Sequence, residues 1–146
     1  MPAEQRFSAV ADSSAPPEAC FALIADATTW RRWAGPMIGR SDWDPAGGEP
    51  PGVGAVRRLG RPPFVTREEI VAYEPPTHHA YVLRRGLPVR AYRADVELRP
   101  VDGGTRIEWS AVFEPRWPGT GRLLAFVLSR TVRGFARRVA KAAPGP

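Results

Sequence analysis

The side chains that could support metal chemistry in this sequence are few. Its only histidines, His78 and His79, are adjacent. Neighbouring residues of a strand point to opposite faces of a sheet, so the two rings cannot easily share one ion. Both are therefore expected at the surface or at a strand end. An inward His79 is the alternative, because it has the parity of Tyr81 and Leu83. No metal site is predicted.

Nucleophilic and acid–base chemistry also lack a recognisable pattern. The sequence contains no GxSxG elbow, and its single cysteine, Cys20, lies on a predicted apolar helix face as a small buried hydrophobe. One cysteine excludes an internal disulfide. Glu68 and Glu69 are adjacent and would face opposite ways, so they form a weak acid–base pair. We predict no cofactor and assign no catalytic residue.

Inward polar groups are the remaining candidates for chemistry. Tyr81 and Tyr92 could each donate a hydrogen bond to a ligand carbonyl, and Glu68 could transfer a proton. The simpler alternative is that each tyrosine only satisfies its hydroxyl within the fold. Which of these two roles applies depends on how the strands that carry the residues orient their side chains.

Two neighbouring segments alternate with the period of a half-buried strand, 89–99 and 105–115. The predicted inner face of the first is Tyr92, Ala94, Val96 and Leu98. The predicted inner face of the second is Ile107, Trp109, Ala111 and Phe113. Both faces place large residues beside small ones, so each is either close-packed core or the wall of a cavity.

Other elements follow from apolar runs that end at turn residues. Further strands are predicted over residues 5–11, 55–59, 64–73 and 79–85. After the first strand, Ser13 or Ser14 could cap a helix that begins with two prolines, and Asp26 could cap a second helix. That second helix places Trp30 and Trp33 on one side. Residues 41–54 are expected to form a long loop, and the role of the region 39–54 stays open.

The last predicted element is an amphipathic helix over residues 119–142, where the period changes to 3.6. Its apolar stripe is Leu124, Leu128, Val132, Phe135 and Val139. Its basic face includes Arg122, Arg130, Arg133, Arg137 and Lys141. Leu123 and Phe126 point toward the basic side.

The net charge of +6 is concentrated in this helix, because no acidic residue follows Gly119. Such a face is usually only solvated, but exposed leucine and phenylalanine among arginines also suit contact with a membrane surface. Nucleic-acid binding is not predicted, because no reader motif is present.

The length of 146 residues predicts a single domain over 1–146. Its first residues lack the apolar run of a signal peptide, and no segment has the roughly 20 apolar residues of a membrane span. A cytoplasmic protein is expected.

The order of elements and three motifs resemble the START/Bet v 1-like (SRPBCC) superfamily, particularly its bacterial polyketide cyclase/dehydrase-like branch. The motifs are APPEACFALIADATTWRRW, EEIVAYEPPTHHAYVL with GGTRIEWSAVFEP, and the closing GTGRLLAFVLSRTVRGFARRV. The resemblance implies an α+β helix-grip fold, in which a curved antiparallel sheet wraps a long C-terminal helix and two short helices follow the first strand.

The resemblance also implies a ligand cavity between the sheet and the long helix. Carried onto this sequence, its wall would be Tyr81, Tyr92, Ala94, Val96, Trp109, Ala111 and Phe113. Leu124 and Leu128 would close it from the helix, and Trp30, Trp33 and Met37 would lie near its mouth.

Several functions are compatible with such a cavity. We expect a module that binds a small hydrophobic or aromatic molecule, lipid or polyketide-like. A polyketide cyclase or dehydratase using the same cavity is one alternative. Another is a peripheral lipid or quinone carrier that docks on membranes through the basic helix, with Arg122, Leu123, Phe126, Arg130, Arg133 and Arg137 as its contacts. An interaction module like the Hsp90-activator relatives is a further one. The sequence predicts neither the ligand nor the oligomeric state.

Overall fold

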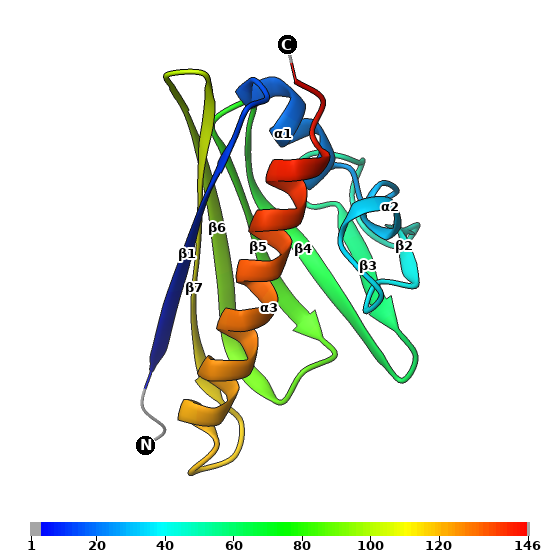
Figure 1. Cartoon of the computed structure of the whole chain (residues 1–146). Coiled ribbons are helices and arrows are strands. Elements are labelled where there is room, and N and C mark those ends of the chain that lie inside the picture. The colour runs from blue at the N-terminus through cyan, green and yellow to red at the C-terminus, as the bar shows by residue number, and fades with distance from the viewer. Residues whose placement is uncertain (1–3, 146) are drawn as a thin grey trace.

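Seven strands form one antiparallel sheet in the order β1-β7-β6-β5-β4-β3-β2 in the computed structural model, which describes residues 4–145 (Figure 1). The strands are β1 (Gln5–Ser13), β2 (Arg40–Asp44), β3 (Val56–Arg61), β4 (Phe64–Glu74), β5 (His78–Arg85), β6 (Val89–Val101) and β7 (Gly104–Pro115). Two short helices, α1 (Pro17–Ala25) and α2 (Trp30–Trp33), follow β1. The long helix α3 (Gly121–Ala142) follows β7. The predicted α+β helix-grip architecture is confirmed.

The alternation predicted for β6 and β7 is present in the structure. On β7, Ile107, Trp109 and Phe113 are fully buried, while the residues between them are more exposed. The register pairs Ala94 with Ala111 across the two strands, so small residues lie opposite each other in the middle of the sheet. This gives room for a helix to approach the sheet closely.

Helix α3 lies along the concave side of the sheet and packs mainly on β1 and β7 (Figure 1). Its predicted stripe faces the sheet: Leu128, Val132 and Val139 are buried, and Leu124 and Phe135 are partly buried. The arginines of the opposite face are exposed. The apolar stripe of an amphipathic helix therefore covers one half of the sheet.

Three local predictions need correction. Strand β2 overlaps the start of the region 41–54 expected to be a loop. Its polar sequence RSDWD pairs with β3 at the sheet edge without apolar alternation. Helix α2 begins at Trp30 rather than at Asp26, whose carboxylate instead accepts hydrogen bonds within a turn from Thr28 N (2.9 Å) and Oγ1 (2.7 Å). Helix α1 has Pro16 as its N-cap, without a serine cap. Ser13 ends β1 and donates its hydroxyl to the Ala140 carbonyl (2.6 Å).

Candidate ligand cavity

A cavity of about 590 Å³ lies between α3 and the half of the sheet that α3 does not cover. Its sheet wall is Leu59, Thr66, Glu68, Tyr81, Leu83 and Tyr92. Its helix wall is Val127, Leu128, Thr131, Val132 and Phe135. Its front consists of Trp30, the segment 36–38, the turn 60–64 and Leu87. This volume and this mainly apolar lining are typical of small-molecule sites.

A buried ion pair lies at the base of the cavity wall. Arg57 on β3 is fully buried, and its Nε donates to Oε1 of Glu68 on β4 at 2.8 Å. The two residues are directly opposite in the β3–β4 register. Glu68 lines the cavity with a relative exposure of 8%. The cavity therefore holds a carboxylate whose charge is balanced by an arginine behind it.

The guanidinium of Arg57 is held between two aromatic rings. Its Cζ lies 4.7 Å from the Trp30 ring centroid and 4.5 Å from the Tyr81 ring centroid. Its Nη1 donates to the Ile24 carbonyl at 2.9 Å. Its Nη2 is buried and makes no hydrogen bond to any residue in 4–145. A buried donor without a partner costs free energy, so this nitrogen is suited to an additional acceptor.

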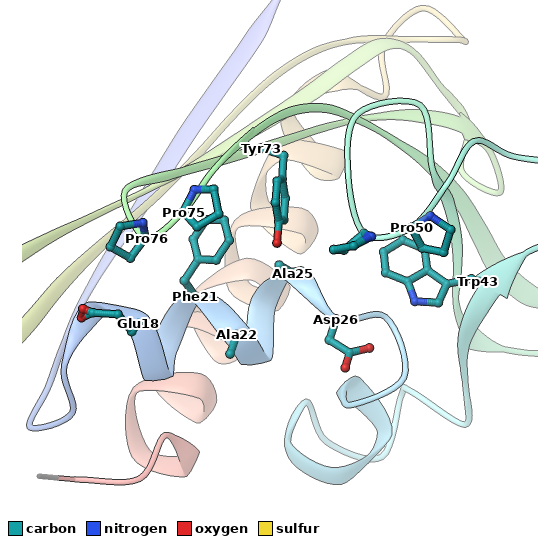
Figure 2. Close-up of a pocket in the computed structure, with 11 residues that line it drawn as sticks. Glu18, Phe21, Ala22, Ala25, Asp26, Trp43, Pro50, Tyr73, Pro75 and Pro76 are labelled. Carbon is teal, nitrogen blue, oxygen red and sulfur yellow. The ribbon is translucent and has the colours of Figure 1, made fainter.

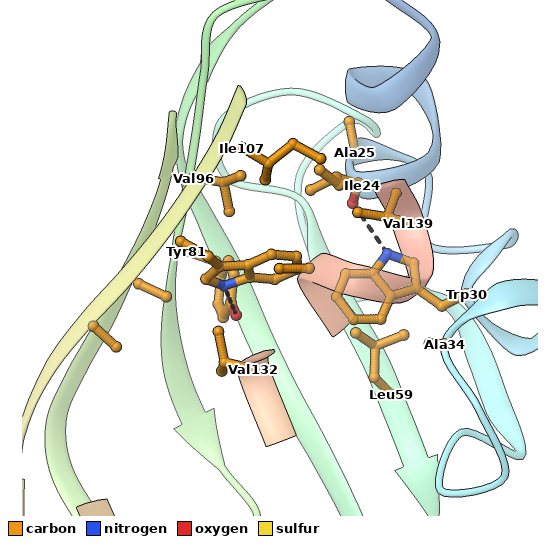
Figure 3. Packing of buried hydrophobic residues seen from close by; sticks show 14 of the residues in the cluster. Ile24, Ala25, Trp30, Ala34, Leu59, Tyr81, Val96, Ile107, Val132 and Val139 are labelled. Carbon is orange, nitrogen blue, oxygen red and sulfur yellow. Dashed lines mark hydrogen bonds between the residues drawn. The ribbon is translucent and has the colours of Figure 1, made fainter. Parts of the chain in front are cut away.

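The tyrosine hydroxyls in the cavity wall stay protonated. Burial, and then the negative charge of Glu68, raise the pKa of Tyr81. Burial is also the first cause that raises the pKa of Tyr92. The indole N–H of Trp109 donates to the Tyr81 oxygen at 3.2 Å (Figure 3), which leaves the hydroxyl proton of Tyr81 free to be donated.

The two histidines do occupy opposite faces, but the expectation that both lie at the surface is wrong for His79. His78 is partly exposed and contacts Glu74 (2.8 Å) and Asp95 (2.7 Å) through its ring nitrogens. His79 is fully buried, as its parity with Tyr81 allowed.

The buried His79 ring is held among aromatic side chains. Its centroid is 5.9 Å from that of Phe21 and 6.3 Å from that of Tyr81. Neither of its ring nitrogens has a hydrogen-bond partner in the described chain. Burial, then the positive charges of Arg57 and His78, lower the pKa of His79 to about 3, so its ring is neutral at physiological pH.

The structure divides the predicted site residues into two groups. Those that line the cavity are Trp30, Met37, Tyr81, Tyr92 and Leu128. Those that lie outside its lining are Trp33, Ala94, Val96, Trp109, Ala111, Phe113 and Leu124. Trp109 is covered by Trp30 and Phe135, whose ring centroids lie 5.8 and 6.2 Å from its own. The β6–β7 face is thus packed under α3 near these rings, and the cavity opens beside it.

On β3 to β5, sequence reasoning named Tyr81 and, as an inward polar candidate, Glu68. It missed Leu59 on β3, Thr66 on β4 and Leu83 on β5, which also line the cavity. A usable signal existed for two of them, since Leu83 has the parity of Tyr81 and Thr66 has the parity of Glu68.

Exposed apolar side chains lie at the cavity mouth and on the adjoining turn of α3. Met37, Phe64 and Val127 line the cavity, yet their relative exposures are 61%, 72% and 48%. Leu123 and Phe126, next to Val127 on α3, are also exposed. The predicted exposure of these two residues on the basic side of the helix is confirmed. We call these five residues the mouth rim.

No cluster of three or more histidine, cysteine, aspartate or glutamate side chains in 4–145 is arranged to hold a metal ion. Within the same range, none of the helices combines the length and apolar character that crossing a membrane requires.

A curved antiparallel sheet, a long C-terminal helix and a cavity between them define a helix-grip protein of the SRPBCC superfamily. Residues 4–144 match the family described as "Polyketide cyclase / dehydrase and lipid transport", and the chain belongs to this family. Solved structures share the fold. One is the crystal structure of Ara h 8.0201, with a TM-score of 0.74 and 18% identity over 94% of this chain and 96% of the other. Another is XoxI from Bacillus cereus, with a TM-score of 0.73 and 17% identity over 94% and 93%.

Curated relatives come from mycobacteria. Uncharacterised proteins of Mycobacterium bovis and of Mycobacterium tuberculosis are 29% identical over 138 residues, which is 91% of this chain and 81% of theirs. Family and fold together are consistent with binding of a hydrophobic ligand in the cavity.

Proposed function

We propose that this protein binds a small, mainly apolar molecule that carries one hydrogen-bonding group. The observation that supports this is the cavity of about 590 Å³, whose mainly apolar lining includes a few polar side chains, Glu68 and Tyr81 among them. An apolar pocket with a few convergent polar groups favours a ligand of the same pattern, because each buried polar group needs a partner.

The polar groups also define an orientation for the ligand. The Tyr81 hydroxyl would donate to a ligand oxygen, and the Glu68 carboxylate would accept from a ligand hydroxyl. The apolar part of the molecule would extend along Leu83, Leu128 and Val132 toward the mouth rim.

Filling the cavity with a side chain tests the proposal. Leu83→Trp places an indole inside the cavity, whereas Val10→Trp adds the same ring at a site with 56% exposure outside it. The neutral fluorophore N-phenyl-1-naphthylamine brightens in apolar pockets. We expect enhanced fluorescence with the unmodified protein and Val10→Trp, and at least about tenfold weaker binding with Leu83→Trp. Equal binding by all three proteins would contradict the proposal. Native mass spectrometry of protein from its own host would identify a retained ligand.

Membrane docking of a carrier is a second candidate, favoured by the mouth rim. The rim is apolar and exposed, and Arg122 and Arg130 lie beside its α3 residues on a helix without acidic residues. Such a surface fits an anionic lipid membrane. Co-sedimentation with vesicles containing phosphatidylserine should fall with salt and with Leu123→Ser/Phe126→Ser. It should change little with Val10→Ser. An absence of binding at low salt would exclude this candidate.

A cyclisation or dehydration reaction in the cavity is the enzymatic alternative. It is favoured by the presence of Glu68 and Tyr81 in one pocket, where a carboxylate could accept a proton and a phenol could donate one. Tyr81→Phe keeps the ring and removes the hydroxyl. We would incubate small-molecule extracts of the host with the unmodified protein and with Tyr81→Phe. A compound in the extract should lose water with the unmodified protein and not with the variant. Extracts that the unmodified protein does not change would exclude the enzymatic alternative and favour ligand binding alone.

A further inference from the structure

A second hollow of about 610 Å³ lies between α1, the end of β4 and the loop after β2, and it shares no lining residue with the ligand cavity. Helix α1 forms its floor, and the β4–β5 turn and the loop after β2 form its walls (Figure 2). We call it the α1 groove. The proposed ligand binding in the cavity involves no residue of the α1 groove, so the two sites are independent.

The middle of the α1 groove is apolar and aromatic. Phe21 and Tyr73 meet edge to face with their ring centroids 5.5 Å apart. Trp43 and Pro50 lie across from them in Figure 2, and Ala22 forms part of the helical floor. Phe21 is buried, so Tyr73, Trp43 and Ala22 present most of the accessible apolar surface. Such a surface accepts an alkyl chain, and its aromatic faces favour a positive charge.

Acidic residues lie at the two ends of the α1 groove. Glu18 is in the first turn of α1, and Asp26 is its C-cap, eight positions later. At the rise of an α-helix, eight residues span about 12 Å. Figure 2 shows Glu18 beyond Pro76 at one end and Asp26 below Trp43 at the other. The two carboxylates are thus separated along the same groove.

These carboxylates have no cationic partner within residues 4–145. Neither forms an ion pair there, and no lysine, arginine or histidine lines the groove. Asp26 Oδ1 accepts two hydrogen bonds from Thr28, which leaves Oδ2 without a partner among the described residues. In a chain with a net charge of +6, a groove lined only by acids and apolar groups is complementary to a cation.

The side chain behind the groove adds no positive charge. His79 packs against Phe21 and Tyr73 from within the core, and its lowered pKa keeps the ring neutral. A cation bound in the α1 groove therefore meets no repulsion from this histidine.

We propose that the α1 groove binds a linear organic dication of the α,ω-diamine or polyamine class. Its alkyl chain lies over Phe21, Ala22 and Tyr73, one ammonium faces Glu18, and the other faces Asp26. The spacing of the carboxylates sets the length of the ligand. The site is independent of the ligand cavity, so each can fail without the other.

Nuclear magnetic resonance titration of the full ¹⁵N-labelled chain tests this assignment at low ionic strength, where exposed charges are least screened. The probe is 1,8-diaminooctane, and the matched probes are octylamine, which lacks one charge, and the shorter 1,3-diaminopropane. We expect 1,8-diaminooctane to shift the amides of Ala22, Ala25 and Tyr73, and to bind at least about tenfold tighter than either matched probe.

Variants separate the charges from the rings. Glu18→Gln and Asp26→Asn should each weaken 1,8-diaminooctane binding about three- to tenfold, as expected for one exposed charge contact, and Trp43→Leu should also weaken it. Glu114→Gln, at the far end of β7, is the control and should leave binding unchanged. Equal binding of octylamine, no effect of the acid substitutions, or shifts confined to cavity residues such as Leu83 would each overturn the proposal.

Discussion

At the scale of single residues, His79 couples the stability of the fold to pH. The pKa of about 3 in the folded state lies below the usual histidine pKa of 6.5, so between these values the unfolded chain binds a proton at this ring and the folded chain does not. The stabilisation is complete above about pH 6.5 and is lost as the pH falls toward 3. We expect the free energy of unfolding at pH 5 to be about 2 kcal/mol lower than at pH 7.5.

Chemical denaturation at several pH values measures this effect, and His79→Leu should flatten it. His78 acts in the opposite direction. Burial lowers its pKa, but hydrogen bonds with Asp95 and Glu74 outweigh burial and raise it overall. Its contribution is present at low pH and is lost as the pH rises through the raised pKa, so His78→Gln should steepen the acid loss. An identical pH profile in His79→Leu would contradict the assignment.

The buried ion pair of Arg57 and Glu68 is the basis of a second prediction at the residue scale. Glu68→Gln leaves a fully buried guanidinium without its counter-charge, and we expect a loss of about 3–5 kcal/mol in the free energy of unfolding. Replacing both residues with methionine should recover much of this loss, because no buried charge then remains. Glu108→Gln, which breaks an exposed pair with Arg99, is the control and should have little effect. Denaturant titrations compare the four proteins.

Arg57 also shows where sequence reasoning fails for single residues. Strand parity correctly predicts the buried faces of Tyr92 and Trp109, because apolar residues recur at every second position. An arginine in such a strand suggests a solvated position, and only the opposite Glu68 and the rings of Trp30 and Tyr81 explain its burial. Those partners come from distant segments, so no local pattern indicates them.

At the scale of elements, apolar periodicity predicts most strands and the long helix. It fails for β2, whose pairing with β3 holds a polar edge strand that has no inward apolar face. The same periodicity cannot say which half of the sheet the helix covers. That choice depends on sheet curvature and on the path of α3, which packs on β1 and β7 and leaves β3 to β5 facing the cavity.

Two tryptophan substitutions on the inner faces compare the two halves of the sheet. Ala111 lies in the packed half with 6% exposure, so Ala111→Trp should reduce the free energy of unfolding by about 1–3 kcal/mol or more. Leu83 lines the cavity, so Leu83→Trp should cost less than about 1 kcal/mol, because the ring enters existing space. Thermal denaturation followed by circular dichroism measures both. A larger loss of stability in Leu83→Trp than in Ala111→Trp would indicate that the free space lies beside β7 instead.

At the scale of the whole molecule, the cavity makes ligand binding a source of stability. A ligand that binds only the folded state at ten times its dissociation constant should raise the free energy of unfolding by about 1.4 kcal/mol. Differential scanning calorimetry with N-phenyl-1-naphthylamine would show this as a concentration-dependent rise in melting temperature. The rise should be much smaller in Leu83→Trp, because this variant binds the fluorophore more weakly, and unchanged in Val10→Trp. A melting temperature independent of the fluorophore would argue against a preformed cavity.

The unequal cover of the sheet by α3 has a consequence for protein engineering. The packing contacts between α3 and the sheet are concentrated on β1 and β7, whereas side chains of β3 to β5 line the cavity. Library mutagenesis can therefore vary Thr66 and Leu83 broadly while leaving the β7 face untouched. The fold is therefore a scaffold in which a new ligand preference can be selected on the cavity side while the packed side, which supports the stability of the fold, stays unchanged.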